Sequence, residues 1–303
     1  MFYGTVLASF KVMKKTLPAD SPEQESIHQR VCGVVDSMPP FPQSVMRLME
    51  MTKDVNCSPK DLVSIIEHDP VMTMKILKLV NSAFFGLSRD VVSIQHALVF
   101  LGMNTVKNLA VSIASIDSLP QKSIPELPME SFLTHSLGTA FIAQRLAKDC
   151  IQLKDVSEYF IAGLLHGFGK MLFVQLEPQR YGKVLQHVKE NRSSLPQLEL
   201  EEIGMNYGEV GAMLAESWQL PSSLVDCIRM HLFCDAKSSD MSITIAAASM
   251  VATAMELGES GETGVDEFPD YVHQRLGVKL EAVIEQFHDL SDEVQQIQSM
   301  VGG

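Results

Sequence analysis

The spacing of apolar residues is the feature that most constrains the fold of this chain. Val71, Met74, Leu77 and Val80 recur every three positions, which places them on one face of a helix. Similar helical spacing recurs along almost the whole sequence, and no segment shows the convincing two-residue alternation of a half-buried strand. The sequence therefore predicts an all-α fold.

Helix start signals agree with this periodicity. Ser58 is a candidate N-cap, followed by Pro59 at the first helical position and Asp61 at the third, and Asp69 before Pro70 repeats the pattern of a cap and a proline. Helices are expected over residues 24–36, 42–53, 59–68, 70–83, 93–101, 103–117, 129–149, 155–166, 168–175, 178–191, 196–203, 207–217, 221–232, 240–257 and 280–299.

The prolines of residues 118–128 interrupt the helical pattern and mark a division of the chain. A second interruption, rich in glycine and acidic residues, is expected as a loop over residues 258–270. The predicted parts are an N-terminal extension (1–26), an N-terminal helical subdomain (27–120), a second helical subdomain (121–257) and an acidic C-terminal helical extension (258–303).

Charge limits the classes of partner. The net charge of −13 argues against a general nucleic-acid binder, which needs a basic face to neutralise phosphates. Residues 256–303 hold eleven acidic and two basic residues, which favours a solvated surface, with docking of a basic partner as the alternative. The apolar stripe of the expected helix 280–299 has to be buried, either against the same chain or in an interface.

Cysteine usage and the N-terminus predict a cytoplasmic location. The five cysteines are dispersed and form no CxxC pair, which indicates reduced thiols. Residues 1–10 lack the basic start of a signal peptide, and the longest uncharged apolar stretches are too short to span a membrane.

Three of the nine histidines lie on or beside apolar helical segments. His135 is early in one expected helix, while His166 and His231 are at or near the ends of two others. If their rings converge, three imidazoles make a ligand set adequate for Zn, Fe or Ni. The alternative is that they are buried histidines hydrogen-bonded to neighbouring carbonyl or hydroxyl groups, with no metal.

Several motifs carry a resemblance to a known family. They are Met-Pro-Pro-Phe-Pro at residues 38–42, Ile-Ile-Glu-His-Asp-Pro and the helix after it at 65–86, Ile-Gln-His-Ala-Leu at 94–98, and Gly-Leu-Leu-His-Gly-Phe-Gly-Lys at 163–170. Over about residues 27–255 the chain resembles the HDOD family, the HD-related output domain of bacterial signalling proteins and a distant relative of HD-GYP cyclic-dinucleotide phosphodiesterases. The resemblance implies an N-terminal helical subdomain packed on a degenerate HD-domain-like helical bundle.

Catalytic HD domains bind metal through a helix histidine, a His-Asp pair and a later aspartate. By resemblance, His135 and His166 match the two histidines, whereas Gly167 stands at the aspartate of the pair and Ser249 at the last aspartate. His231 matches, more loosely, a further histidine of the two-metal relatives. Because hydrolysis of a phosphodiester needs a metal to activate water, the loss of both carboxylates predicts that the chain is not an enzyme.

Lys170 matches a lysine that faces phosphate in the HD-GYP pattern, with a solvated lysine after a helix end as the alternative.

The expected function is therefore a non-catalytic signal-transduction output or scaffold module that acts through protein–protein interaction. The alternatives are a residual metal-dependent phosphohydrolase and a sensor that binds a metal or nucleotide in the vestigial pocket.

No cofactor is expected beyond the divalent metal that the three histidines would hold. The expected partners are signalling proteins such as sensor kinases or response regulators, with a homodimer as a further option, and neither a membrane nor a nucleic acid. The loop at 84–87 and the acidic segment are the expected docking surfaces.

Overall fold

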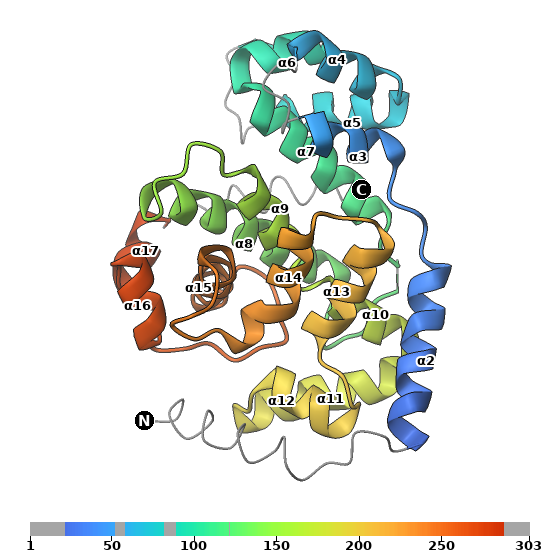
Figure 1. Cartoon of the computed structure of the whole chain (residues 1–303), viewed down its shortest axis with the longest axis vertical. Helices are drawn as coiled ribbons and strands as arrows, with labels where there is room; N and C mark the ends of the chain where they lie inside the picture. The colour runs from blue at the N-terminus through green and yellow to red at the C-terminus, as the bar shows by residue number, and fades with distance from the viewer. Residues whose placement is uncertain (1–21, 52–57, 82–88, 121, 288–303) are drawn as a thin grey trace.

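A computed structural model describes residues 22–51, 58–81, 89–120 and 122–287 of the chain (Figure 1). Within these residues it contains helices and an isolated β-bridge between Ile124 and Leu127, but no strand, so the predicted all-α fold is confirmed. The α-helices are α2 (Pro22–Ser37), α3 (Gln43–Met51), α4 (Pro59–Glu67), α5 (Pro70–Val80), α6 (Ile94–Leu101), α7 (Met103–Asp117), α8 (Met129–Asp149), α9 (Ser157–Leu165), α10 (Phe168–Leu176), α11 (Pro178–Asn191), α12 (Leu195–Glu202), α13 (Tyr207–Ser217), α14 (Ser222–Met230), α15 (Asp240–Ala254), α16 (Asp270–Leu276) and α17 (Leu280–Gln286). A 3₁₀-helix, η2 (His231–Phe233), follows α14.

The observed helices match the predicted ones within a few residues at most boundaries. The sequence does not predict α16, which has only seven residues and follows an acidic, glycine-rich segment. The helix expected over 280–299 is described only as α17, because residues 288–303 lie outside the described part of the chain.

The predicted caps of α4 and α5 form as hydrogen bonds. The Ser58 hydroxyl accepts the backbone N–H of Asp61, whose carboxylate in turn accepts the N–H of Ser58, which makes a capping box. The Asp69 carboxylate accepts the backbone N–H groups of Val71 and Met72 at the start of α5. Local sequence therefore determines where these two helices begin.

Helices α3 to α7 pack against one another in the upper part of Figure 1, and α7 also packs against α9 below. Helix α2 lies apart from them and packs against α10 and α13. One continuous set of buried apolar side chains joins both parts of the chain. The division near residue 120 accordingly stays a prediction.

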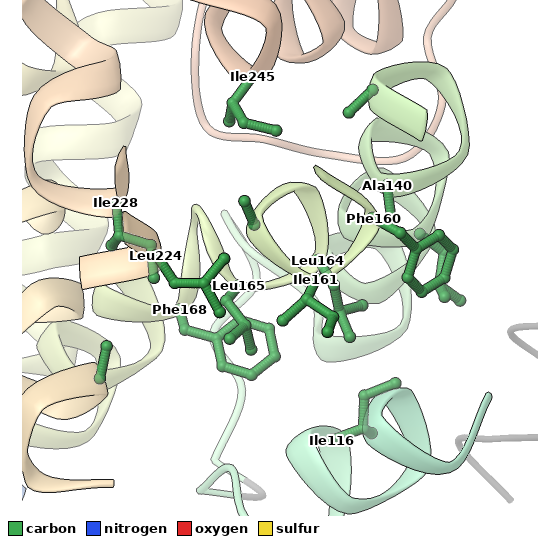
Figure 2. Packing of buried hydrophobic residues seen from close by; sticks show 14 of the residues in the cluster. Ile116, Ala140, Phe160, Ile161, Leu164, Leu165, Phe168, Leu224, Ile228 and Ile245 are labelled. Carbon is green, nitrogen blue, oxygen red and sulfur yellow. The ribbon is translucent and has the colours of Figure 1, made fainter. Parts of the chain in front are cut away.

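The second part is a bundle in which α9 packs against α8, α8 against α15, and α13 against both α10 and α14. Gly163 on α9 allows a close approach to α8, since a Cβ there would lie 2.7 Å from Cα of Ala140. Phe160 and Leu164 of α9 are buried beside this contact (Figure 2). This tight pairing fixes the position of the histidine at the end of α9 relative to the one on α8.

Trp218 connects the first motif of the chain to the bundle. Its ring stacks on Phe41 with centroids 4.9 Å apart, and its Nε1–H donates to the carbonyl oxygen of Pro39 at 3.1 Å. Trp218 is therefore buried against the segment that precedes α3.

Residues 157–176, which comprise α9 and α10, are long and apolar enough to cross a membrane by length and composition. The sequence prediction did not anticipate a run of this length. Of the most apolar part of this segment, 89% is buried inside the protein, as is usual for the central helices of a folded core.

The described cysteines, Cys32, Cys150, Cys227 and Cys234, are free thiols, as predicted. Cys57 lies outside the described residues.

The first part of the C-terminal extension packs against the same chain. Helices α16 and α17 both contact α15, and Val272, Leu276, Leu280 and Val283 are buried there. The described half of the apolar stripe therefore covers its own bundle. Its remaining residues, and the expected docking loop at 84–87, lie outside the described residues.

Candidate functional site: a buried histidine and ion-pair centre

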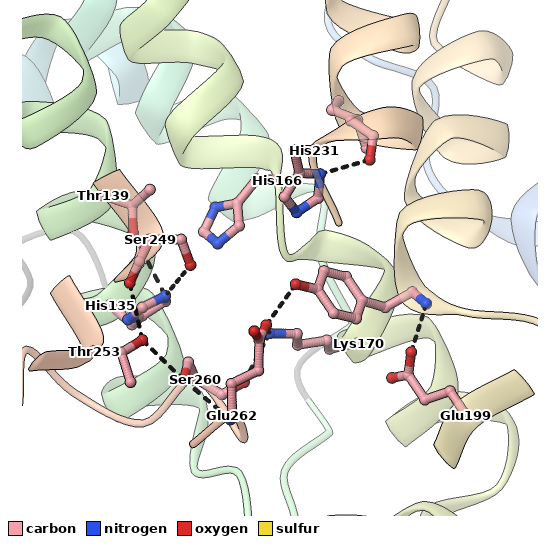
Figure 3. Close-up of polar contacts among 12 residues, drawn as sticks. His135, Thr139, His166, Lys170, Glu199, His231, Ser249, Thr253, Ser260 and Glu262 are labelled. Atoms are coloured by element: carbon pink, nitrogen blue, oxygen red, sulfur yellow. Dashed lines mark hydrogen bonds and ion pairs between the residues drawn. The ribbon is translucent and has the colours of Figure 1, made fainter. Parts of the chain in front are cut away.

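Three helices bring the three predicted histidines together (Figure 3). His135 lies on α8, His166 follows the last residue of α9, and His231 follows α14. The ring centroids of His135 and His166 are 5.5 Å apart, and those of His166 and His231 are 5.4 Å apart. All three side chains are buried, so the predicted convergence is confirmed.

The tautomers of His166 and His231 follow from their contacts. Nδ1 of His166 lies 2.6 Å from the carbonyl oxygen of Gly163, and Nδ1 of His231 lies 2.8 Å from that of Ile228. Because a carbonyl oxygen only accepts hydrogen bonds, both Nδ1 atoms carry the proton. Burial lowers the pKa of His231 to about 4 and that of His166 well below its ordinary value, so both rings are neutral at pH 7.

The Nε2 atoms of His166 and His231 are consequently lone-pair acceptors. Both are buried, and neither has a hydrogen-bond partner in the described part of the chain. A buried acceptor left without a donor costs roughly 1–3 kcal/mol. These two atoms therefore favour a donor, such as a water or a ligand, in the centre.

His135 has different surroundings. Its Nε2 lies 3.5 Å from the Thr139 hydroxyl and 3.4 Å from the Ser249 hydroxyl, while burial lowers its pKa to about 3. Ser249 is the residue that the resemblance places at the last metal-binding aspartate. Here its hydroxyl contacts a histidine directly.

Gly167, at the other expected aspartate position, faces an aromatic ring. A Cβ at Gly167 would lie 3.2 Å from Cε2 of Phe132, a ring that also packs against Phe168 with centroids 6.1 Å apart. Phe132 thus borders the space into which a side chain at position 167 would extend.

The described residues contain no group of three or more His, Cys, Asp or Glu side chains that could hold a metal ion. Nε2 of His135 faces two hydroxyls, and the positive charge of Lys170 is close enough to lower the pKa of His135 and His166 further. Binding of a metal by His135, His166 and His231 stays a prediction.

An ion pair between a fully buried lysine and a partly exposed glutamate completes the centre. Lys170 on α10 is fully buried, and its Nζ donates to Oε1 of Glu262 at 2.7 Å and to the carbonyl oxygen of Ser260 at 2.8 Å. The Tyr207 hydroxyl donates to the same Oε1 at 2.5 Å, and Lys170 Nζ lies 4.0 Å from the Tyr207 ring centroid. Burial alone would raise the pKa of Glu262, but the charge and hydrogen bond of Lys170 and the Tyr207 hydroxyl lower it below its ordinary value. Lys170 is therefore not the solvated lysine that the sequence allowed.

A second buried carboxyl group lies behind Tyr207. Glu199 on α12 accepts the Tyr181 hydroxyl at 2.7 Å and the backbone N–H of Tyr207 at 2.8 Å. Burial raises the pKa of Glu199 to about 8, against the lowering effect of these hydrogen bonds and of Lys170. Glu199 links α11, α12 and the start of α13, and so holds Tyr207 in place.

Sequence reasoning did not find Glu262, Tyr207 or Glu199. Glu262 belongs to a segment interpreted as acidic surface or docking surface, and it contacts Lys170 across 92 positions of sequence. Nothing in a local charge pattern distinguishes the one acidic residue that turns inward. The two glycines at 258 and 261 were the available sign in the sequence that this loop has an unusual backbone conformation. In the structure both have a positive φ.

The bundle and its converging histidines, with no carboxylate at position 167 or 249, define a degenerate HD-like domain. The HDOD domain family matches residues 38–232, which is more than half of the chain. The chain therefore belongs to the HDOD family, and the predicted family is confirmed.

Solved structures share the fold. An HDOD domain protein of unknown function from Geobacter sulfurreducens has a TM-score of 0.77 at 23% identity, over 92% of this chain and 98% of that one. A protein from Marinobacter aquaeolei VT8, named as a candidate signal transduction protein, has a TM-score of 0.74 at 20% identity, over 95% and 68% of the two chains. A candidate phosphohydrolase from Shewanella amazonensis SB2B has a TM-score of 0.70 at 23% identity, over 90% and 98%. At these identities the similarity shows the fold alone.

A curated relative is an uncharacterised protein of Treponema pallidum (strain Nichols). It is 25% identical over 238 residues, which cover 78% of this chain and 45% of the relative. The chain thus spans less than half the length of that protein.

Proposed function

We propose that this protein is a non-catalytic signalling module that acts by binding other proteins. The observation that carries the proposal is the state of the former catalytic centre. Gly167 and Ser249 provide no carboxylate, His135 contacts hydroxyl groups, and the Lys170 charge is neutralised by Glu262 within the chain. A hydrolytic centre needs an activated water on a metal, and these residues supply no acidic ligand for one.

An exposed group of apolar side chains supports binding of a protein. Val71 and Met74 on α5, Val92 just before α6, and Val99 and Phe100 on α6 are 55–77% exposed. Helices α5 and α6 pack against each other, and Met74 and Val92 line a hollow of about 610 Å³ between them. We call these five residues, which lie on two helices that pack together and just before the second, the apolar patch. Exposed apolar residues on adjacent elements are candidates for an interaction surface.

The proposed partners are signalling proteins such as sensor kinases or response regulators, and a second copy of the chain is the competing occupant of the patch. The family and the candidate signal transduction protein among the similar structures support a signalling partner. The role of the acidic segment as a second docking surface stays a prediction for its exposed residues.

The experiment compares two surface variants. Val99→Asp combined with Phe100→Asp places two charges in the apolar patch, whereas Met230→Asp changes an apolar residue that is 48% exposed on α14. Both should remain folded, since exposed substitutions usually change stability by about 0.5 kcal/mol or less. Quantitative affinity capture from the native cell should show a signalling protein lost by the patch variant and kept by Met230→Asp.

Capture of the same proteins by both variants would contradict the proposal. Light scattering on the purified chain provides the second readout. A homodimer that the patch variant dissociates, with no other partner lost, would assign the patch to self-association instead.

The alternative of a ligand sensor is favoured by one observation, the two acceptor atoms Nε2 of His166 and His231 that point into the centre without a donor. A residual phosphohydrolase has no comparable support from the geometry.

A further inference from the structure

Glu262 reaches the histidine centre from a distant part of the chain. It lies in the link between α15 and α16, beyond the residues that match the family, and its carboxylate accepts two hydrogen bonds on one oxygen. Lys170 Nζ and the Tyr207 hydroxyl are the donors, on α10 and α13. An ammonium and a hydroxyl converging on one point make an oxyanion site, and Glu262 is the anion that fills it.

The segment that carries Glu262 is built to enter the bundle. Gly258 has φ of +69°, and a Cβ there would lie 2.0 Å from the carbonyl oxygen of Ser131, so only glycine fits. The next residue, Glu259, donates its backbone N–H to that same oxygen at 3.2 Å. The carbonyl oxygen of Ser260 accepts a hydrogen bond from Lys170 Nζ, and the Ser260 hydroxyl accepts one from the backbone N–H of Glu262. The loop is thus fixed at both Ser131 and Lys170.

The charge of Glu262 also reaches the histidines. It raises the pKa of His135 and His231 against the larger lowering effect of burial, which places the carboxylate within electrostatic range of both rings. His231 and Tyr207 have ring centroids 5.7 Å apart. The oxyanion site therefore lies beside the histidine cluster, and Figure 3 shows Lys170 and Glu262 together with the three histidines.

We propose that Glu262 is an internal occupant, supplied in cis, of an oxyanion site formed by Lys170 and Tyr207, and that the external ligand of this site is a protonated oxyanion of the hydrogen-phosphate type. The loop at 258–262 closes the site in the resting protein. This inference does not depend on the protein-binding function of the apolar patch.

The chemistry of the ligand follows from the two kinds of group around the centre. Lys170 and Tyr207 donate, so they require an anionic acceptor in place of the Glu262 carboxylate. The Nε2 atoms of His166 and His231 accept, so a ligand that also carries a proton can donate to them. Hydrogen phosphate has both anionic oxygens and a P–OH group, whereas sulfate at neutral pH has only acceptors.

The test removes the internal anion and supplies inorganic phosphate. Glu262→Ala in the full chain should gain a saturable rise in Tm with millimolar phosphate, while the wild type should show none beyond the effect of a potassium chloride control at matched ionic strength. Sulfate at the same ionic strength should stabilise the variant at least several-fold less. The double variant Glu262→Ala with Lys170→Met should lose the response.

Three results would overturn the proposal: no phosphate response in Glu262→Ala, an equal response in the wild type, or an equal response without Lys170. If Glu262→Ala does not fold in plain buffer, Glu262→Ser is used and refolding is scored with and without phosphate. Refolding that requires phosphate supports the internal-anion role. Failure of both variants to refold in phosphate counts against it, because an external anion would then be unable to replace the carboxylate.

Discussion

Two regions of this molecule depart from the usual distribution of polar and apolar residues, and they do so in opposite directions. In the apolar patch on α5 and α6, large apolar side chains are more than half exposed. In the histidine centre of the bundle, Lys170, Glu199 and three histidines are buried. Exposed apolar groups and buried polar groups are the informative exceptions in a folded protein, because each has a cost that some other interaction has to offset.

The difference lies in what offsets the cost. In the centre, most polar atoms have partners inside the chain: Lys170 with Glu262 and Ser260, and Glu199 with Tyr181 and Tyr207. The apolar patch has no such cover among the described residues. Under the proposed function, the internal contacts hold the centre together, and the patch is the surface offered to an external protein.

The largest effect is expected from Lys170→Met, which breaks the buried ion pair. Removing one partner of a fully buried pair typically costs about 3–5 kcal/mol, and the loss here should approach that value from below, because the Lys170 side chain is 1% exposed but that of Glu262 is 26% exposed. The matched control is Lys75→Met, which breaks the Lys75–Asp117 pair at 2.7 Å, with side chains 22% and 44% exposed. That change should cost about 1 kcal/mol or less.

Urea unfolding of both variants measures the two costs. Similar, small losses for Lys170→Met and Lys75→Met would show that the ion pair does not hold the centre together, and the comparison of the two regions would fail.

A smaller, pH-dependent effect is expected from Glu199. Burial raises the pKa of Glu199 in the folded state to about 8 from an ordinary value of 4.5, so the folded protein holds a proton that the unfolded chain releases. This contribution to stability is fully present below pH 4.5 and is lost as the pH rises through 8. Near pH 7 its slope is on the order of 1 kcal/mol per pH unit.

Glu199→Gln imitates the protonated carboxyl group and should flatten the fall in stability between about pH 5 and pH 8. Glu201→Gln, at an exposed position of the same helix, is the control for the change in net charge and should keep the wild-type slope. Equal slopes in the wild type and Glu199→Gln would indicate that Glu199 titrates normally.

The fold could be predicted largely from sequence because helix formation here has local causes. The apolar period of α5 and the caps at Ser58 and Asp69 act within a few residues of the helices they define. Helix α16 was missed because seven residues contain too few turns to show a period.

The site could be predicted only in part. His135, His166 and His231 were found because each is a rare polar residue on an apolar helical segment, and a family resemblance connected them. Glu262 was not found, because its role comes from a contact with Lys170 that only the tertiary structure creates. The apolar period of α5 likewise did not identify its buried face, since Met72, Ile76 and Leu79 are buried whereas Val71 and Met74 are exposed.

The most direct test of the central claim is a hydrolysis screen of the purified full chain. Cyclic dinucleotides and nucleoside phosphates are incubated with Mn²⁺ or Mg²⁺, with a relative that has both carboxylates as positive control and His166→Ala as the matched inactive variant. The absence of metal-ligating carboxylates at Gly167 and Ser249 predicts turnover no higher for the wild type than for His166→Ala. Metal-dependent turnover by the wild type that disappears in His166→Ala would contradict a non-catalytic role.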